Sequence, residues 1–171
     1  IANNAHILTK IYVPPQIFPI SVAIAGLVNF FIGLIPLAIV VFVSGQTIAW
    51  TSPLVIILGL FLSLLVAGIG LALSTVVIRF DDTKNIINVF LMILTYLTPI
   101  FYPIGILNPQ LQRIVNLNPL TSYLDCFRWA FSNNASVSTG DWIYVGISGL
   151  LAIFFGTQIF NKFWPRTVAM L

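Results

Sequence analysis

The sequence contains very little charge, one cysteine and one histidine. Its 171 residues include seven Lys or Arg and four acidic residues, all of which are Asp. Soluble domains carry about 25% charged residues, whereas 6% of this chain is charged, which excludes a water-soluble fold. A lone cysteine excludes an intrachain disulfide framework, and the lone His6 cannot build a metal site by itself.

Apolar and aromatic residues are abundant instead, at 59% and 13% of the chain, which excludes a disordered segment. Four uncharged apolar blocks cover residues 17–43, 53–78, 86–104 and 142–160. The blocks are continuously apolar rather than alternating, which excludes the strands of a membrane barrel. Since a helix of about 17–25 apolar residues spans a bilayer, we predict an all-α integral membrane protein with four transmembrane helices in one domain.

The loops between the blocks predict the orientation. Four crossings place residues 1–16, 79–85 and 161–171 on one side of the membrane. That side holds five of the seven basic residues: Lys10, Arg79, Lys84, Lys162 and Arg166. Basic loops favour the cytoplasmic side, so we expect both ends of the chain to be cytoplasmic and residues 105–141 to be extracellular.

Residues 1–16 contain a candidate amphipathic helix followed by a linker. Ile7, Leu8 and Ile11 form an apolar stripe, and Pro14 and Pro15 end the pattern. This helix either lies on the membrane surface or is presented to a cytoplasmic partner. The chain starts with Ile and shows no signal-peptide pattern, so we expect it to begin inside a longer protein.

The densest charge cluster is the turn formed by Arg79, Asp81, Asp82 and Lys84. It is either a solvated loop that obeys the positive-inside rule or an ion-paired elbow between two helices. Two aspartates alone do not bind Mg²⁺, and no glycine-rich phosphate loop precedes them.

The end of the third block is aromatic and is interrupted by Pro99 and Pro103. Interrupted backbone at membrane depth is tolerated where it is buried in protein or lines a wet cavity. An interfacial aromatic belt is the alternative, but the accompanying threonines favour a cavity. The predicted substrate path consists of Tyr96, Thr98, Phe101 and Tyr102.

Two short helices are predicted in residues 105–141, because Asn108-Pro109 and Asn118-Pro119 each place a capping residue before a proline. Neither helix is long enough to span the bilayer, so both are expected to be re-entrant. The second helix has an apolar face of Leu120, Leu124, Phe127 and Phe131. Asp125 and Arg128 on this helix are three residues apart and are expected to form an ion pair. Trp129 is a further candidate residue, and Cys126 is expected to have a structural role.

The sequence offers no candidate residues for catalysis. The blocks contain no carboxylate pair, and neither Cys126 nor any serine has a plausible base. The uncharged blocks also disfavour a voltage sensor or a proton-relay transporter. We therefore expect a protein that is not an enzyme and has neither a catalytic residue nor a metal site.

The order of motifs resembles the type-2 ATP-binding-cassette (ABC) export permeases, most closely the subgroup that exports polysaccharides, O-antigens and teichoic acids. The segments that carry this resemblance are Asn4, Ile7–Pro14, Gly70–Ser74, Arg79–Asp81, Thr98–Pro103 and Asn118–Leu120. Phe80 departs from the family, which usually has an Arg-Asp pair in this turn. The four blocks are similar to the last four of six family helices, so the chain resembles the C-terminal part of such a permease.

The resemblance implies a permease that works as a homodimer with a separate ATPase subunit. ATP and Mg would bind to that ATPase, with no cofactor on this chain, and no nucleic acid would be involved. The ATPase-coupling residues implied in this way are Asn4, His6, Ile7, Leu8, Lys10, Ile11 and Tyr12. The implied function is the transport of a lipid-linked polysaccharide (O-antigen, capsule or teichoic acid type) across the bacterial cytoplasmic membrane. One alternative is that the permease exports drugs or plain lipids. The other is that the chain is a channel subunit or a structural membrane subunit.

Overall fold

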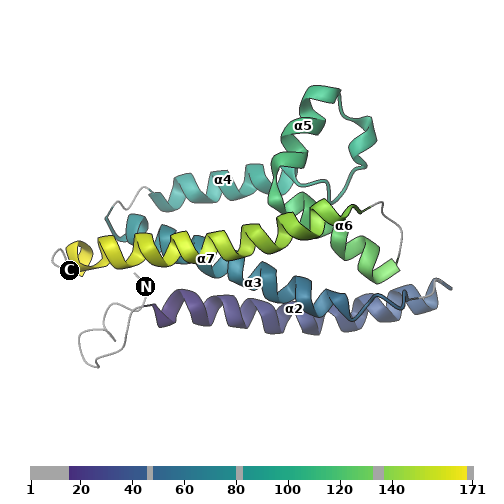
Figure 1. Ribbon diagram of the computed structural model, residues 1–171, viewed down its shortest axis with the longest axis horizontal. Helices are drawn as coiled ribbons and strands as arrows, with labels where there is room; N and C mark the ends of the chain where they lie inside the picture. The colour runs from purple at the N-terminus through teal and green to yellow at the C-terminus, as the bar shows by residue number, and fades with distance from the viewer. Residues whose placement is uncertain (1–15, 46–47, 80–82, 133–136, 169–171) are drawn as a thin grey trace.

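A computed structural model describes residues 16–45, 48–79, 83–132 and 137–168, and helices form all the regular structure in these ranges (Figure 1). The long helices are α2 (Ile17–Val43), α3 (Leu54–Arg79) and α7 (Thr139–Val168). The shorter elements are α4 (Thr83–Leu97), the 3₁₀ turn η2 (Ile104–Ile106), α5 (Pro109–Leu117) and α6 (Pro119–Ser132). The prediction of an all-α membrane protein is confirmed.

Three of the helices, α2, α3 and α7, are long and apolar enough to cross a membrane. Helix α2 has the predicted bounds and continues through Pro36, and α7 extends beyond the predicted 142–160 at both ends. The single helix predicted over 86–104 is wrong, since α4 ends at Leu97 after 15 residues. At about 1.5 Å per residue α4 measures roughly 22 Å, less than the ~30 Å of a bilayer core. The number of crossings therefore stays a prediction.

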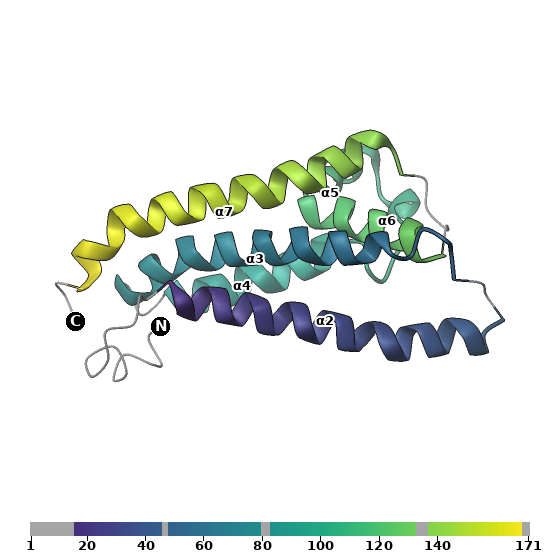
Figure 2. The ribbon, with the colours of Figure 1, turned by 60° about the horizontal axis from the view of Figure 1, so that its bottom comes forward.

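Helices α3 and α7 lie side by side in both ribbon views and form the most extensive helix–helix contact (Figures 1 and 2). A Cβ atom at Gly68 of α3 would overlap the backbone of Ala152, and one at Gly156 of α7 would overlap the backbone of Gly68. At Gly149 a Cβ would lie 2.8 Å from the carbonyl oxygen of Phe61. Small residues allow this backbone contact between membrane helices.

Helix α6 packs against one end of this helix pair. Its buried residues Tyr123, Cys126 and Phe131 join Val55 of α3 and Val145 of α7 in the main hydrophobic cluster. The phenolic hydroxyl of Tyr123 donates a hydrogen bond to the Val145 carbonyl at 2.9 Å. Helix α6 is thus fixed to the bundle, whereas α5 projects away from it (Figure 1).

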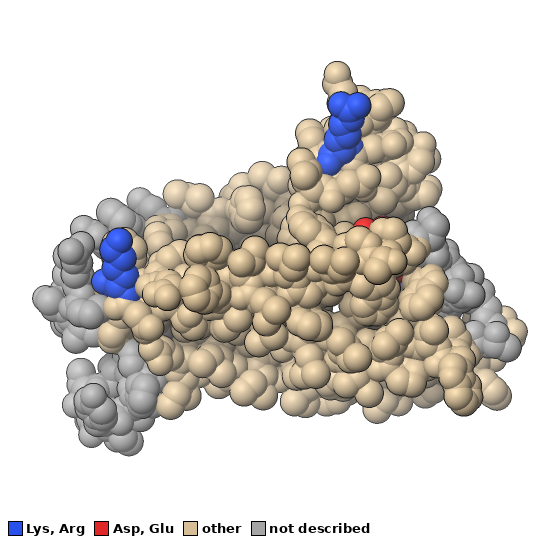
Figure 3. Space-filling model, viewed as in Figure 1, with Lys and Arg blue, Asp and Glu red and all other residues tan. Residues whose placement is uncertain are grey.

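The outer faces of the helices are apolar. Ala23 is the buried residue of α2, and large side chains such as Val22 and Ile35 are exposed along it. Figure 3 shows helix faces almost free of charge, with the visible basic side chains near one end of the bundle and on the α5 projection. This surface is suited to contact with lipid or with another membrane helix.

Candidate functional site

The helical structure is interrupted over residues 98–103, between α4 and η2, and we call this segment the break. Pro99 has no backbone N–H and disfavours a helical conformation at Thr98, so the helix ends at Leu97. Helix ends leave carbonyl groups without intrahelical partners. Here the Tyr102 hydroxyl reaches back and donates to the carbonyls of Tyr96, at 2.9 Å, and Leu97, at 3.4 Å. Tyr102, which lies within the break, therefore caps the end of α4.

Helix α6 holds the break from the other side. The Nη2 atom of Arg128 donates to the carbonyls of Pro99, at 3.0 Å, and Ile100, at 3.2 Å. The Asn118 amide donates to the Thr98 hydroxyl at 3.0 Å. We call these contacts from Arg128 and Asn118 the α6 clamp.

The predicted pairing of Asp125 with Arg128 is confirmed, with 3.7 Å between Oδ1 and Nη1. Burial raises the pKa of the Asp125 carboxyl, and the positive charge of Arg128 opposes that shift. Because both side chains are partly exposed, the pair contributes less than about 1 kcal/mol.

Both predicted Asn-Pro helix starts are confirmed. The Asn108 side chain accepts a hydrogen bond from the backbone N–H of Leu111 at 2.8 Å, and the Asn118 side chain accepts one from that of Leu120 at 3.1 Å. The amide of Asn118 thus caps α6 through its oxygen while its nitrogen reaches the break, so one residue links the helix start to the α6 clamp.

Two further residues of α6 are structural. Cys126 is fully buried, and burial, reinforced by the charges of Asp141 and Asp125, raises its pKa to about 12. A thiol with that pKa stays protonated and unreactive at neutral pH. The Trp129 ring lies edge-on to Trp142 of α7, with 6.1 Å between centroids, which adds an aromatic contact between the two helices.

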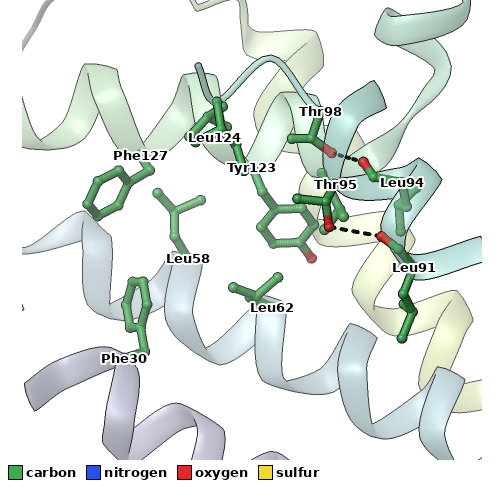
Figure 4. Close-up of a pocket in the computed structure, with 12 residues that line it drawn as sticks. Phe30, Leu58, Leu62, Leu91, Leu94, Thr95, Thr98, Tyr123, Leu124 and Phe127 are labelled. Carbon is green, nitrogen blue, oxygen red and sulfur yellow. Dashed lines mark hydrogen bonds between the residues drawn. The ribbon is translucent and has the colours of Figure 1, made fainter. Parts of the chain in front are cut away.

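A cavity of about 560 Å³ lies between α2, α3, α4 and α6, next to the break (Figure 4). Its walls are mostly apolar and include Phe30, Leu58, Leu62, Leu94, Tyr123 and Phe127. Most of these residues were missed by the sequence analysis, because they come from four helices distant along the chain. The apolar face of α6 was the available signal, since its Leu120, Leu124 and Phe127 line the cavity.

The predicted substrate-path residues separate in the structure. Thr98 lines the cavity, whereas Tyr96 and Phe101 are 68% and 86% exposed. Tyr102 is partly buried, and its hydroxyl is engaged by the end of α4. The last turn of α4 and the break thus each expose one aromatic residue, Tyr96 and Phe101, while Thr98 lines the cavity.

The predicted elbow of Arg79, Asp81, Asp82 and Lys84 is described only in part. Helix α3 ends at Arg79, and Lys84 is exposed in the first turn of α4. Asp81 and Asp82 lie outside the described residues, as do the coupling residues of segment 1–15. The ion-paired elbow and the coupling helix therefore stay predictions.

Comparison with known proteins gives concordant results. Residues 4–132 match the ABC-2 type transporter family. Two O-antigen export system permease proteins RfbA of Klebsiella pneumoniae are 29% and 30% identical over 98% of this chain and 65% of their own length. The protein of that name from Myxococcus xanthus is 26% identical over 77% of this chain and 51% of its own length. The chain thus spans between half and two thirds of the length of these relatives.

The family match covers most of the chain, and the fold has the apolar helices that a membrane transporter requires. The family match also agrees with the resemblance found in the sequence motifs. The chain therefore belongs to the ABC-2 type transporter family.

Proposed function

We propose that the chain forms part of the permease subunit of an ATP-driven exporter that moves lipid-linked O-antigen polysaccharide across the bacterial cytoplasmic membrane. The observation that carries this proposal is the alignment with two O-antigen export permeases, which covers 98% of the chain at 29% and 30% identity. In this proposal two permease copies form the path, a separate ABC ATPase hydrolyses ATP, and both ends of this chain are cytoplasmic.

The break after α4 fits a polysaccharide. Tyr96 and Phe101 expose their ring faces on the surface of the chain, and flat aromatic faces offer contact area without demanding one pattern of hydroxyl groups. Such rings suit a long glycan that must slide past them. The α6 clamp contacts Thr98, Pro99 and Ile100, which lie between the two aromatic residues along the chain.

Complementation tests the proposal as a whole. The gene that encodes this chain is expressed, together with the gene for an ABC ATPase of an O-antigen export system, in an O-antigen-producing strain that lacks its own export permease. We expect O-antigen to reach the cell surface, detected by antibody on intact cells. Accumulation of the lipid-linked polymer inside cells that contain the permease in the membrane would contradict the proposed substrate.

Removing the two exposed rings is expected to impair export. Replacing Tyr96 and Phe101 with alanine removes about 1–3 kcal/mol of ring contacts, which corresponds to a roughly 5- to 150-fold loss of export rate. The rate of appearance of surface glycan measures the effect. Phe42→Ala is the control, because Phe42 is exposed on α2 and belongs neither to the break nor to the cavity wall. An equal loss in all variants would contradict a specific role for Tyr96 and Phe101.

The coupling assignment has its own test. Replacing Ile7 and Leu8 with aspartate puts two charges on the apolar stripe, so we expect ATP hydrolysis to continue while export is lost. Thr9→Asp adds a charge on the opposite side of the same predicted helix and serves as the control. ATPase activity and glycan export are measured in the same vesicles. Unchanged export in the double variant would refute coupling through this segment.

A further inference from the structure

We propose that the cavity between α2, α3, α4 and α6 binds the hydrocarbon chain of a membrane lipid. This goes beyond the proposed function, because it assigns a ligand to a site apart from the exposed rings of the break. The cavity measures about 560 Å³, which lies within the range of roughly 300–1,000 Å³ typical of small-molecule sites. Leucine and phenylalanine side chains from the surrounding helices form most of its wall (Figure 4).

The hydroxyl groups in the wall are already engaged. Thr95 donates to the Leu91 carbonyl and Thr98 to the Leu94 carbonyl, each at 2.8 Å, and these bonds are drawn in Figure 4. Tyr123 donates to the Val145 carbonyl at 2.9 Å. The three hydroxyl hydrogens are therefore directed to the protein's own backbone and not offered to a ligand.

This lining discriminates between possible occupants. An ordered water needs about two to four polar partners, and a sugar buried here would leave its hydroxyl groups without partners at a cost in free energy. A hydrocarbon chain requires no hydrogen bonds and matches the apolar wall. In a membrane, lipid chains are also the most abundant molecules of this kind beside the helices.

Helix α4 provides a second, independent observation. It buries none of its residues, although its Leu91, Leu94 and Thr95 face the cavity. A chain in the cavity would cover these side chains and fill the space between α4 and α6. The ligand would thereby cover α4 side chains that the described residues leave exposed.

Photo-crosslinking in native membranes tests the proposal. Vesicles from cells that express the gene receive either a phosphatidylethanolamine with a diazirine in its acyl chain or a polyprenyl phosphate with a diazirine in its tail. We expect crosslinks to residues of the cavity wall, located by mass spectrometry of the digested protein. Labelling by the first probe would identify a phospholipid as the source, and labelling by the second an isoprenoid carrier.

Cavity-filling variants make the test specific. Leu62→Trp on α3 and Leu94→Trp on α4 each place an indole in the cavity, so labelling of the remaining wall should fall to background while the protein stays folded in the membrane. Leu60→Trp is the matched control, because Leu60 is exposed on the same helix and does not line the cavity. Absence of cavity-wall crosslinks with both probes, or equal labelling in all folded variants, would overturn the proposal. Export by the unaltered protein is measured separately, so failure of the proposed function would be recognised independently.

Discussion

Leucine in place of Gly68 or Gly156 is expected to prevent the bundle from folding. Even a single Cβ atom at either position would overlap the backbone of the opposite helix. Backbone atoms cannot rotate away as a side chain does, so α3 and α7 must separate. Overpacking typically costs about 1–3 kcal/mol and sometimes more, and here it would disrupt the most extensive contact in the structure. We expect little folded protein, measured by size-exclusion chromatography and thermal unfolding in detergent.

Gly26→Leu is the matched control for this experiment. Gly26 also lies within an apolar helix, but a Cβ atom there would meet nothing within 4 Å. Leucine should be tolerated at this position, and its better helix propensity favours it over glycine. Normal yield and unfolding temperature for Gly68→Leu and Gly156→Leu would show that α3 and α7 do not pack backbone to backbone.

Methionine in place of Arg128 is expected to release the break after α4. The substitution keeps an unbranched apolar stem but removes the donor to the carbonyls of Pro99 and Ile100. Hydrogen bonds to charged groups contribute about 1.5–3 kcal/mol each, and partial exposure of Arg128 reduces the expected total to about 2 kcal/mol. For a chain of this size that corresponds to a fall of roughly 4–8 °C in unfolding temperature. Export should fall as well, because Phe101 follows the released segment.

Arg113→Met controls for the loss of a positive charge. Arg113 lies on α5 and is exposed, so we expect its replacement to change the unfolding temperature by less than that of Arg128. Asp125→Asn separates the ion pair from the clamp, since it keeps both carbonyl contacts of Arg128 available. If Asp125→Asn and Arg128→Met are equally destabilising, the ion pair rather than the carbonyl contacts would account for the stability.

Local features were predictable from the sequence because short-range chemistry determines them. The bounds of α2 follow from an uncharged stretch of the required length, and the starts of α5 and α6 follow from Asn-Pro capping. The pairing of Asp125 with Arg128 follows from their spacing on a helix. Each of these interactions joins residues within one element.

Features that depend on distant residues were not predictable in the same way. The helix predicted to reach residue 104 stops at Leu97. The carbonyls of Pro99 and Ile100 beyond it accept hydrogen bonds from Arg128, which lies 29 and 28 residues later in the chain. The cavity needs Phe30, Leu58 and Tyr123 to converge from separate helices. Hydropathy identifies such residues as buried or lipid-facing but does not specify their neighbours. The coupling segment and the elbow stay predictions of the sequence.

Because α3 and α7 meet backbone to backbone at Gly68 and Gly156, no side chain can repack between them at these positions. Relative sliding would drive one helix into the other at Gly68 and Gly156, so the two helices behave mechanically as one strut. In contrast, α2 buries only Ala23 and α4 buries no residue. Any change of shape within this part of the chain should therefore occur as α2 and α4 move against a stationary α3–α7 strut.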